Sequence, residues 1–288
     1  MPLRADTVGR QLPEQIVRVT PRMALAYAAG IGETSPLCAD DTLEGFMAPP
    51  SFCVRPEWQL VIANRTGGLG MTPEETIRGV HAGQNTTFHA PIRPGVALRV
   101  SGEVAEVRAT AAGALVRTRL SSVDAETGAA LATTLTTALY RGVAVEGEGR
   151  ALPGIVDVTE AATPPENTEE TTLPLDRLFA HRYTECADIW NPIHTERAVA
   201  LAAGLPDIIV HGTALWALAG RVLTERYAPG APQRLTSLNG RFSAMVLAGD
   251  PITVRHGPTT RPGELAFAVL NAHGKEAVSR GLATFTAA

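Results

Sequence analysis

The chain lacks most of the features that mark secreted, membrane-embedded or metal-binding proteins. Its three cysteines among 288 residues have neither metal-type nor redox-type spacing, so neither a metal site nor a disulfide framework is expected. No run of about 18 apolar residues is present, which argues against a membrane-spanning helix. Residues 1–14 carry scattered charges and no apolar core, so a signal peptide is not expected. A reduced, cytoplasmic protein is the simplest interpretation.

Strongly basic character is also absent. The net charge is −4, and basic residues do not cluster with aromatic ones, so nucleic acid is not an expected partner. Hydrophobic residues make up 45% of the chain and charged residues 19%, and these proportions fit a globular protein with a substantial core.

The length allows two domains, and the composition indicates where they meet. Residues 144–172 are rich in Glu, Pro, Gly and Thr, and a segment of this composition cannot bury much apolar surface. We therefore predict an N-terminal domain over residues 1–143, a linker over 144–172 and a C-terminal domain over 173–288.

The two predicted domains repeat one another. Residues 27–38 align without gaps on residues 183–194, an offset of 156, and residues 88–100 align on residues 242–254, an offset of 154. Two matched segments in the same order and at nearly the same offset indicate an internal duplication.

Each repeat combines a helix-like segment with strand-like ones. Residues 214–223 place apolar side chains almost all round a helix, which is typical of a buried helix. Alternation of Val and Leu with Arg and Thr predicts antiparallel strands with one covered face over residues 97–104, 114–123, 251–256 and 265–272. The pattern predicts an α+β fold that occurs twice in tandem.

The clearest indication of chemistry is the segment 183–194 together with the pair His211-Gly212. Asn191 and Pro192 form a rigid corner just before His194, and the His-Gly pair opens the second helix-like run. These residues, with an aromatic residue ahead of them, resemble the hydratase-2 signature of the MaoC-like (R)-specific enoyl-CoA hydratases and dehydratases. The resemblance covers most of the chain.

The resemblance implies a double hotdog, in which each of two tandem domains wraps a curved antiparallel sheet around a long central helix. It implies a degenerate N-terminal hotdog and a catalytic C-terminal one. The implied substrate is an acyl thioester of coenzyme A or acyl carrier protein, from fatty acid or polyketide metabolism, that is hydrated or dehydrated between C2 and C3. The resemblance implies no metal and no cofactor. Because a double hotdog already holds a hotdog pair in one chain, we expect a monomer (a pseudo-dimer) or a homodimer.

Water addition to a 2-enoyl thioester assigns a role to each residue of the motif. His194 can act as the base, because imidazole titrates near neutral pH. The N–H of Gly212, at a helix N-terminus, can stabilise the oxyanion that forms on the thioester carbonyl. His211 can instead cap the helix or pack under it, and Tyr183 can be a core aromatic residue. We expect four residues to bind the substrate: Asn191, His211, Tyr183 and Trp190.

One position departs from the family pattern. The catalytic Asp of the family falls on Ile189, and the nearest carboxylates belong to Asp188 and Glu185. We predict that Asp188 is catalytic, with the loop shifted by one residue; otherwise His194 acts with a water, with Glu185 or with a group from the other half. In the first repeat Cys38 stands in place of the His, so that site is expected to be degenerate.

Three functions remain open at this point. The first is reversible hydration of a 2-enoyl thioester, with His194 as base and Gly212 as oxyanion donor. The second is a different reaction on the same fold, such as that of an isomerase, a cyclase or a thioesterase, and Ile189 favours it. The third is a non-catalytic protein that binds acyl thioesters.

Overall fold

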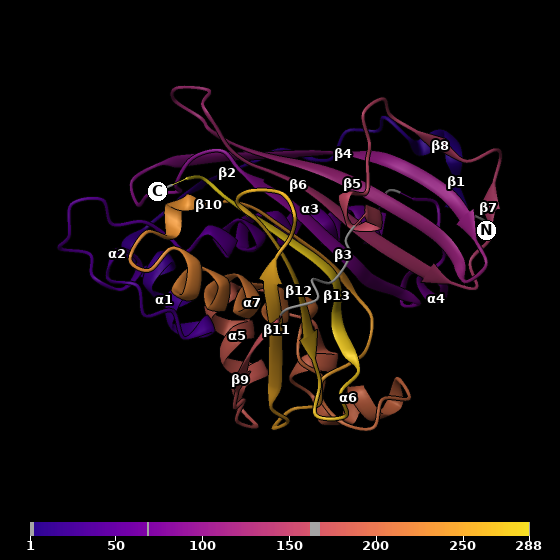
Figure 1. Cartoon of the computed structure of the whole chain (residues 1–288). Helices are drawn as coiled ribbons and strands as arrows, with labels where there is room; N and C mark the ends of the chain where they lie inside the picture. Colours follow the sequence, from indigo (N-terminus) through magenta and orange to yellow (C-terminus); the bar gives the residue numbers. More distant parts are fainter. Residues whose placement is uncertain (1–2, 68, 162–167, 288) are drawn as a thin grey trace.

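A computed structural model describes residues 3–67, 69–161 and 168–287 of the chain (Figure 1). The elements of the N-terminal half are β1 (Leu3–Arg4), β2 (Gln15–Arg18), α1 (Pro21–Ile31), α2 (Pro36–Ala39), α3 (Val54–Gly67), α4 (Pro73–Thr76), β3 (Gly79–Phe88), β4 (Ala97–Thr110), β5 (Gly113–Asp124) and β6 (Ala130–Arg141). The crossover contains β7 (Val145–Glu146), β8 (Arg150–Ala151) and a 3-10 turn, η3 (Val158–Ala161). The elements of the C-terminal half are β9 (Glu169–Leu173), α5 (Phe179–Ala187), the 3-10 turn η4 (Pro192–His194), α6 (Arg197–Ala202), α7 (Gly212–Tyr227), β10 (Leu235–Phe242), β11 (Ile252–Pro258), β12 (Glu264–Leu270) and β13 (Glu276–Phe285).

All strands of the two halves except β1 form one continuous antiparallel sheet, and β1 pairs in parallel with β7. Its order is β2-β4-β5-β6-β3-β10-β13-β12-β11-β9, with β3 and β10 paired at the junction. Read outward from that junction, the order of the second half repeats the order of the first. The sheet topology therefore matches the duplication that the sequence predicts.

Aligned residues of the two repeats also face each other. Asn85 of β3 is paired directly with Asn239 of β10, and the two residues are 154 positions apart, like one pair of aligned segments. Tyr27 of α1 and Tyr183 of α5 are 156 positions apart, and their ring centroids lie 6.3 Å from each other. Equivalent positions meet in this way across an approximate two-fold axis. The internal duplication is confirmed.

The central helix of the second half is α7, which contacts all four strands from β10 to β13 (Figure 1). Eleven of its residues are buried, from Thr213 to Thr224, and their side chains lie on every side of the helix. The helix predicted over residues 214–223 is confirmed and is longer at both ends. The corresponding helix of the first half is α3, and Trp58 and Trp216 stand at the same distance from the first residue of each helix.

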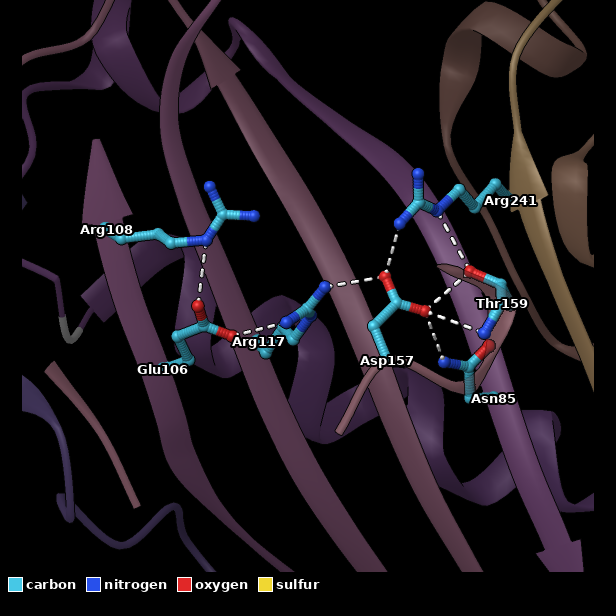
Figure 2. A network of polar contacts seen from close by, with 7 residues as sticks. All are labelled: Asn85, Glu106, Arg108, Arg117, Asp157, Thr159 and Arg241. Atoms are coloured by element: carbon cyan, nitrogen blue, oxygen red, sulfur yellow. Dashed lines mark hydrogen bonds and ion pairs between the residues drawn. The ribbon is translucent and has the colours of Figure 1, made fainter. Parts of the chain in front are cut away.

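A buried polar network fastens the crossover to both halves (Figure 2). The Asp157 carboxylate accepts hydrogen bonds of 2.7 Å from Arg117 of β5 and from Arg241 of β10. The Arg117 guanidinium also pairs with Glu106 of β4 at 2.5 Å. The side chains of Arg117 and Asp157 are only 7% and 8% exposed. One charged cluster thus joins the two halves beside the junction of β3 and β10, and its other members are Asn85, Arg108 and Thr159.

The segment predicted as a linker is only partly irregular. Residues 162–167 lie outside the described residues, but residues 169–172 belong to β9, which pairs with β11. Their polar composition is that of an edge strand, with one side open to water, so composition alone gave no sign of a strand. The domain boundaries themselves stay a prediction. Within the described ranges no helix is both long and apolar enough to cross a membrane.

Candidate active site

The segment that holds the candidate base is a helix followed by a sharp turn. Helix α5 ends at Asp188, which has the left-handed backbone conformation (φ 55°) that stops the helix. The chain then turns through Ile189, whose N–H donates to the carbonyl of Thr184 at 3.1 Å. Asn191 caps η4, since its side-chain oxygen accepts from the N–H of Ile193 at 3.5 Å. Asn191 therefore holds the turn that carries the imidazole.

The ring of His194 is fixed in one tautomer. Its Nδ1 lies 2.8 Å from the carbonyl oxygen of Ile209, and because a carbonyl only accepts, Nδ1 carries the proton. The other nitrogen, Nε2, is then an acceptor, and it makes no hydrogen bond to the described residues. Burial is the main cause that lowers the pKa of His194 to about 4; the hydrogen bond to the Ile209 carbonyl opposes this effect, and the positive charge of Arg65 adds to it. At neutral pH His194 is an uncharged base.

A second imidazole lies against the first. The rings of His211 and His194 are stacked, with centroids 3.7 Å apart and an angle of 26° between their planes. His211 is 2% exposed, and its Nε2 lies 3.1 Å from the hydroxyl of Thr184. Burial, and next the neighbouring His194, lower the pKa of His211. His211 thus packs at the start of α7 and against the ring of His194.

Helix α7 begins at Gly212 with its N-terminus uncapped. His211 is the residue before the helix, and its side chain makes no capping hydrogen bond. The first N–H groups of a helix lack partners within the helix, so they are free to bind an oxygen atom of a substrate. A Cβ atom at Gly212 would lie 2.9 Å from the ring of Phe242, so only glycine fits here without displacing that ring.

The two aromatic residues predicted to bind substrate have different places. Tyr183 is fully buried, its ring centroid lies 5.0 Å from that of His211, and its hydroxyl has no hydrogen-bond partner among the residues described. It lies behind the histidine pair. Trp190 is 59% exposed, and its Nε1 donates to Glu196 at 3.3 Å. The structure brings Tyr183 to the site and leaves Trp190 on the surface.

The structure does not bring Asp188 together with His194. The Asp188 side chain is 66% exposed and pairs with Arg55 at 3.4 Å. Within the described part of the chain, no hydrogen bond or ion pair joins it to His194. Ile189, which stands in the family's Asp position, is buried at 2% exposure. Glu185 is exposed on α5. Asp188 itself has the left-handed backbone conformation that follows α5, and this conformation turns its carboxylate outward.

One residue of the N-terminal half, His81, lies beside this site, and the charge of a second, Arg65, acts on it; the motif contains neither. The ring of His81 on β3 meets the ring of Phe242 at 4.8 Å, and Phe242 is the residue against Gly212. Burial, followed by the charge of Arg65 on α3, lowers the pKa of His81 to about 3. Because Arg65 also lowers the pKa of His194, its positive charge acts on both rings. No sequence pattern links His81 or Arg65 to the motif, because these two residues belong to the other half of the chain.

In the first repeat, cysteines stand at the positions of the two stacked histidines. Cys38 is fully buried, and Cys53 precedes Val54 at the start of α3, where the second repeat has His211 and Gly212. A cavity of about 140 Å³ lies there. Its lining is mostly apolar and includes Met47, Pro49, Pro50, Phe88, Leu131 and Leu235. The exposed His89 also lines this cavity, and its Nε2 lies 2.9 Å from the hydroxyl of Thr133.

Comparison with known proteins agrees with this architecture. The model of the MaoC-like domain matches residues 160–259, and the model of the FAS1-like dehydratase region matches residues 6–133. A 3-hydroxyacyl-thioester dehydratase of Mycobacterium tuberculosis is 27% identical over 275 residues, which cover 93% of this chain and 91% of the relative.

Solved structures share the fold. A MaoC-like dehydratase from Phytophthora capsici superposes with a TM-score of 0.83 at 21% identity, over 98% of each chain. A protein of Mycobacterium tuberculosis described as a double hotdog superposes with a TM-score of 0.60 at 14% identity, over 95% of this chain and 94% of its own. The predicted double hotdog is confirmed.

Proposed function

The chain joins a FAS1-like dehydratase region to a MaoC-like domain in one double hotdog, and from this premise we propose that it is a hydro-lyase acting on acyl thioesters. It reversibly hydrates a 2-enoyl thioester, and in the other direction it dehydrates an (R)-3-hydroxyacyl thioester. The observation that carries the proposal is the arrangement of His194: a neutral imidazole with Nδ1 held by Ile209 and Nε2 free, close to the uncapped N-terminus of α7.

The reaction needs a base, an oxyanion donor and a proton for C2. Nε2 of His194 takes a proton from water while the water oxygen bonds to C3. The electron pair of the C2–C3 double bond moves toward the thioester carbonyl, and the N–H of Gly212 stabilises the negative oxygen. The imidazolium then returns its proton to C2 as the carbonyl re-forms. One hydrogen and one hydroxyl have been added, and no electrons have been gained or lost.

A single histidine can perform both proton transfers in this scheme. The carboxylate of the family pattern is replaced by the buried Ile189, and Asp188 points away. Because the proton removed from water is the one delivered to C2, no second acid is required for the balance. A base whose pKa is about 4 is weak, but its conjugate acid is correspondingly strong, which favours rapid delivery of the proton.

The proposal is tested by replacing His194. Purified protein with crotonyl-CoA should remove the enoyl chromophore, and His194→Gln should lower kcat/KM by about 10²- to 10⁴-fold, the usual contribution of a positioned base. The matched control is His273→Gln, which changes an exposed histidine beyond β12 and should leave turnover unchanged.

Three outcomes would count against the proposal. Unchanged turnover in His194→Gln would remove the base from the mechanism. Release of free thiol with no formation of a hydrated product would identify a thioesterase. Binding of acyl-CoA with no turnover of any thioester would identify a binding protein.

A further inference from the structure

The ring of His194 needs two constraints to keep its Nε2 pointing in one direction. The torsion that rotates an imidazole about its Cβ–Cγ bond has a broad energy minimum, so the rotamer alone does not set the plane of the ring. The hydrogen bond from Nδ1 to the carbonyl of Ile209, 2.8 Å long, fixes where one edge of the ring points. Because a single hydrogen bond is one line of contact, the ring can still turn about that line. A second contact must therefore set its plane.

The ring of His211 provides this second contact. Its centroid lies 3.7 Å from that of His194, with 26° between the two planes, so the flat faces of the rings are in van der Waals contact. His211 is 2% exposed, whereas His194 is half-buried. The more deeply buried ring thus forms a platform on which the other one lies.

The platform is itself held by several contacts. Nε2 of His211 lies 3.1 Å from the hydroxyl of Thr184, a residue that is 1% exposed. The carbonyl of Thr184 also accepts hydrogen bonds from the N–H groups of Asp188 and Ile189, so Thr184 connects the end of α5 to the imidazole. The ring of Tyr183 lies 5.0 Å from that of His211, and the backbone of Ile189 also interacts with the imidazole. These contacts leave the plane of His211 little freedom.

Both constraints on His194 come from the segment that also carries the proposed oxyanion donor. Ile209 supplies the carbonyl, His211 supplies the ring, and Gly212 is the first residue of α7. The N–H of Val210 donates at 2.8 Å to the loop that follows β10, which anchors this segment to the sheet. A shift of the segment would move the base and the donor together, so their relative position is preserved.

The first repeat shows that the fold itself does not require the stacked rings. Cys38 stands at the position that aligns with His194. Cys53 precedes α3 as His211 precedes α7. Both cysteines are fully buried, and burial raises the pKa of each thiol, so they behave as small apolar side chains. The histidine pair therefore accompanies the candidate site and is not needed to pack a hotdog.

We propose that His211 is a positioning residue of the reaction, whose stacked ring sets the plane of His194 and is itself held by Thr184. This inference rests on the proposed function, and it gives His211 a role other than direct contact with the substrate. The position of a reacting group matters steeply, since a displacement of about 1 Å can lower a rate by roughly 10²-fold. Loss of the stack should therefore lower kcat and leave KM nearly unchanged.

The test compares two replacements that separate the flat ring of His211 from its hydrogen-bonding nitrogen. His211→Phe keeps a flat ring for His194 to lie on, and His211→Gln keeps a polar group for Thr184 but no ring. With crotonyl-CoA, His211→Gln should lower kcat by about 10- to 100-fold and change KM by less than about threefold. His211→Phe should have a kcat about 3- to 10-fold above that of His211→Gln, as the strength of aromatic stacking predicts.

Matched controls exist for both parts of the arrangement. Thr184→Val removes the hydroxyl with little change of shape and should lower kcat by about 3- to 10-fold. Its control is Thr224→Val, since Thr224 is 5% exposed on α7 and its hydroxyl donates to the carbonyl of Gly220 at 2.8 Å. The control for His211→Gln is His256→Gln, which changes an imidazole 1% exposed on β11. Both controls should leave kcat per folded molecule unchanged, and melting curves give the folded fraction.

The mobility of the His194 ring provides a readout that does not depend on turnover. Nuclear magnetic relaxation of its Cε1–H group, assigned by the loss of the signal in His194→Gln, reports motion of the ring. The ring should be rigid in the unaltered protein and in His211→Phe, and mobile in His211→Gln. If no thioester is turned over, the proposed function fails, and this comparison alone decides the inference.

Four results would overturn the inference. A kcat for His211→Phe at or below that of His211→Gln would assign the effect to hydrogen bonding, and a larger change in KM than in kcat would assign it to binding. A His194 ring that is equally rigid in the three proteins would show that the stack does not hold it. An equal loss of kcat in Thr184→Val and Thr224→Val would remove Thr184 from the arrangement, and this pair decides if a variant of His211 does not fold.

Discussion

Replacing Asp157 by asparagine should destabilise the protein, because this carboxylate is the only anion that bridges Arg117 and Arg241 in the network of Figure 2. The substitution keeps the shape of the side chain and removes its charge. Among the described residues, Arg117 is then left with Glu106 as its one anionic partner, in a place where its side chain is 7% exposed. A buried ion pair that loses one partner typically costs about 3–5 kcal/mol.

The pKa of Asp157 gives an independent magnitude. Burial alone would raise it, but hydrogen bonds from Thr159 and Arg241 and the charges of Arg117 and Arg241 lower the pKa from 3.8 to about 2. A displacement of this size corresponds to about 2 kcal/mol of stability. Taken together, the two arguments predict a loss of about 2–4 kcal/mol in the free energy of unfolding at pH 7. In a chain of this size, that is a fall of about 4–16 °C in Tm.

The assay is denaturant unfolding of the unaltered protein and of the Asp157→Asn variant, followed by circular dichroism at several pH values. The folded-state pKa lies below the unfolded one, so the stabilisation is complete above pH 3.8 and is lost as the pH falls through 2. The difference between the two proteins should shrink to about half by pH 3. The matched control is Glu103→Gln, because Glu103 pairs with Arg119 on the same two strands, β4 and β5, but with side chains 22% and 40% exposed. That change should cost less than about 1 kcal/mol. A difference at pH 7 no larger than that of the control, or one that stays constant down to pH 3, would refute the reasoning.

The remaining predictions concern the candidate site. Asp188→Asn should keep kcat/KM within about threefold, because the side chain is 66% exposed and pairs with Arg55; a loss comparable to that of His194→Gln would restore Asp188 as the acid. The pH dependence of kcat/KM should be flat above about pH 5 and fall about tenfold per pH unit below about pH 4, since His194 is the required base and its neutral form dominates above its pKa. Rates recorded directly after a pH jump, before unfolding, provide the test, and an acid limb near pH 6.5 would contradict the burial of this ring.

Much of the fold was accessible from the sequence because the duplication was visible in it. Two ungapped alignments, together with alternating strands and one all-round apolar helix, predicted a tandem α+β fold, and the paired Asn85 and Asn239 confirm the symmetry. The network around Asp157 was not predictable. It joins β4, β5 and β10 to the crossover, and no local pattern indicates which strand's arginine will meet a given carboxylate. The crossover appeared to be a solvated linker because it is rich in Glu, Pro, Gly and Thr, although its Asp157 is 8% exposed.

The same contrast between local and long-range contacts explains which residues of the candidate site could be predicted from the sequence. His194 and Gly212 belong to short motifs whose neighbours in sequence are also their neighbours in space, so sequence patterns find them. The orientation of the Asp188 carboxylate depends on the left-handed backbone conformation of Asp188 itself, and the spacing of the motif does not predict that conformation. The stacked histidines have no counterpart in the other repeat: Cys38 takes the place of His194, and Cys53 precedes α3 as His211 precedes α7. In a duplicated chain, the repeat without the motif therefore serves as a reference for the repeat that has it. Positions at which the two copies share a backbone but differ in chemistry, such as His194 and Cys38, separate what the fold requires from what the candidate site requires.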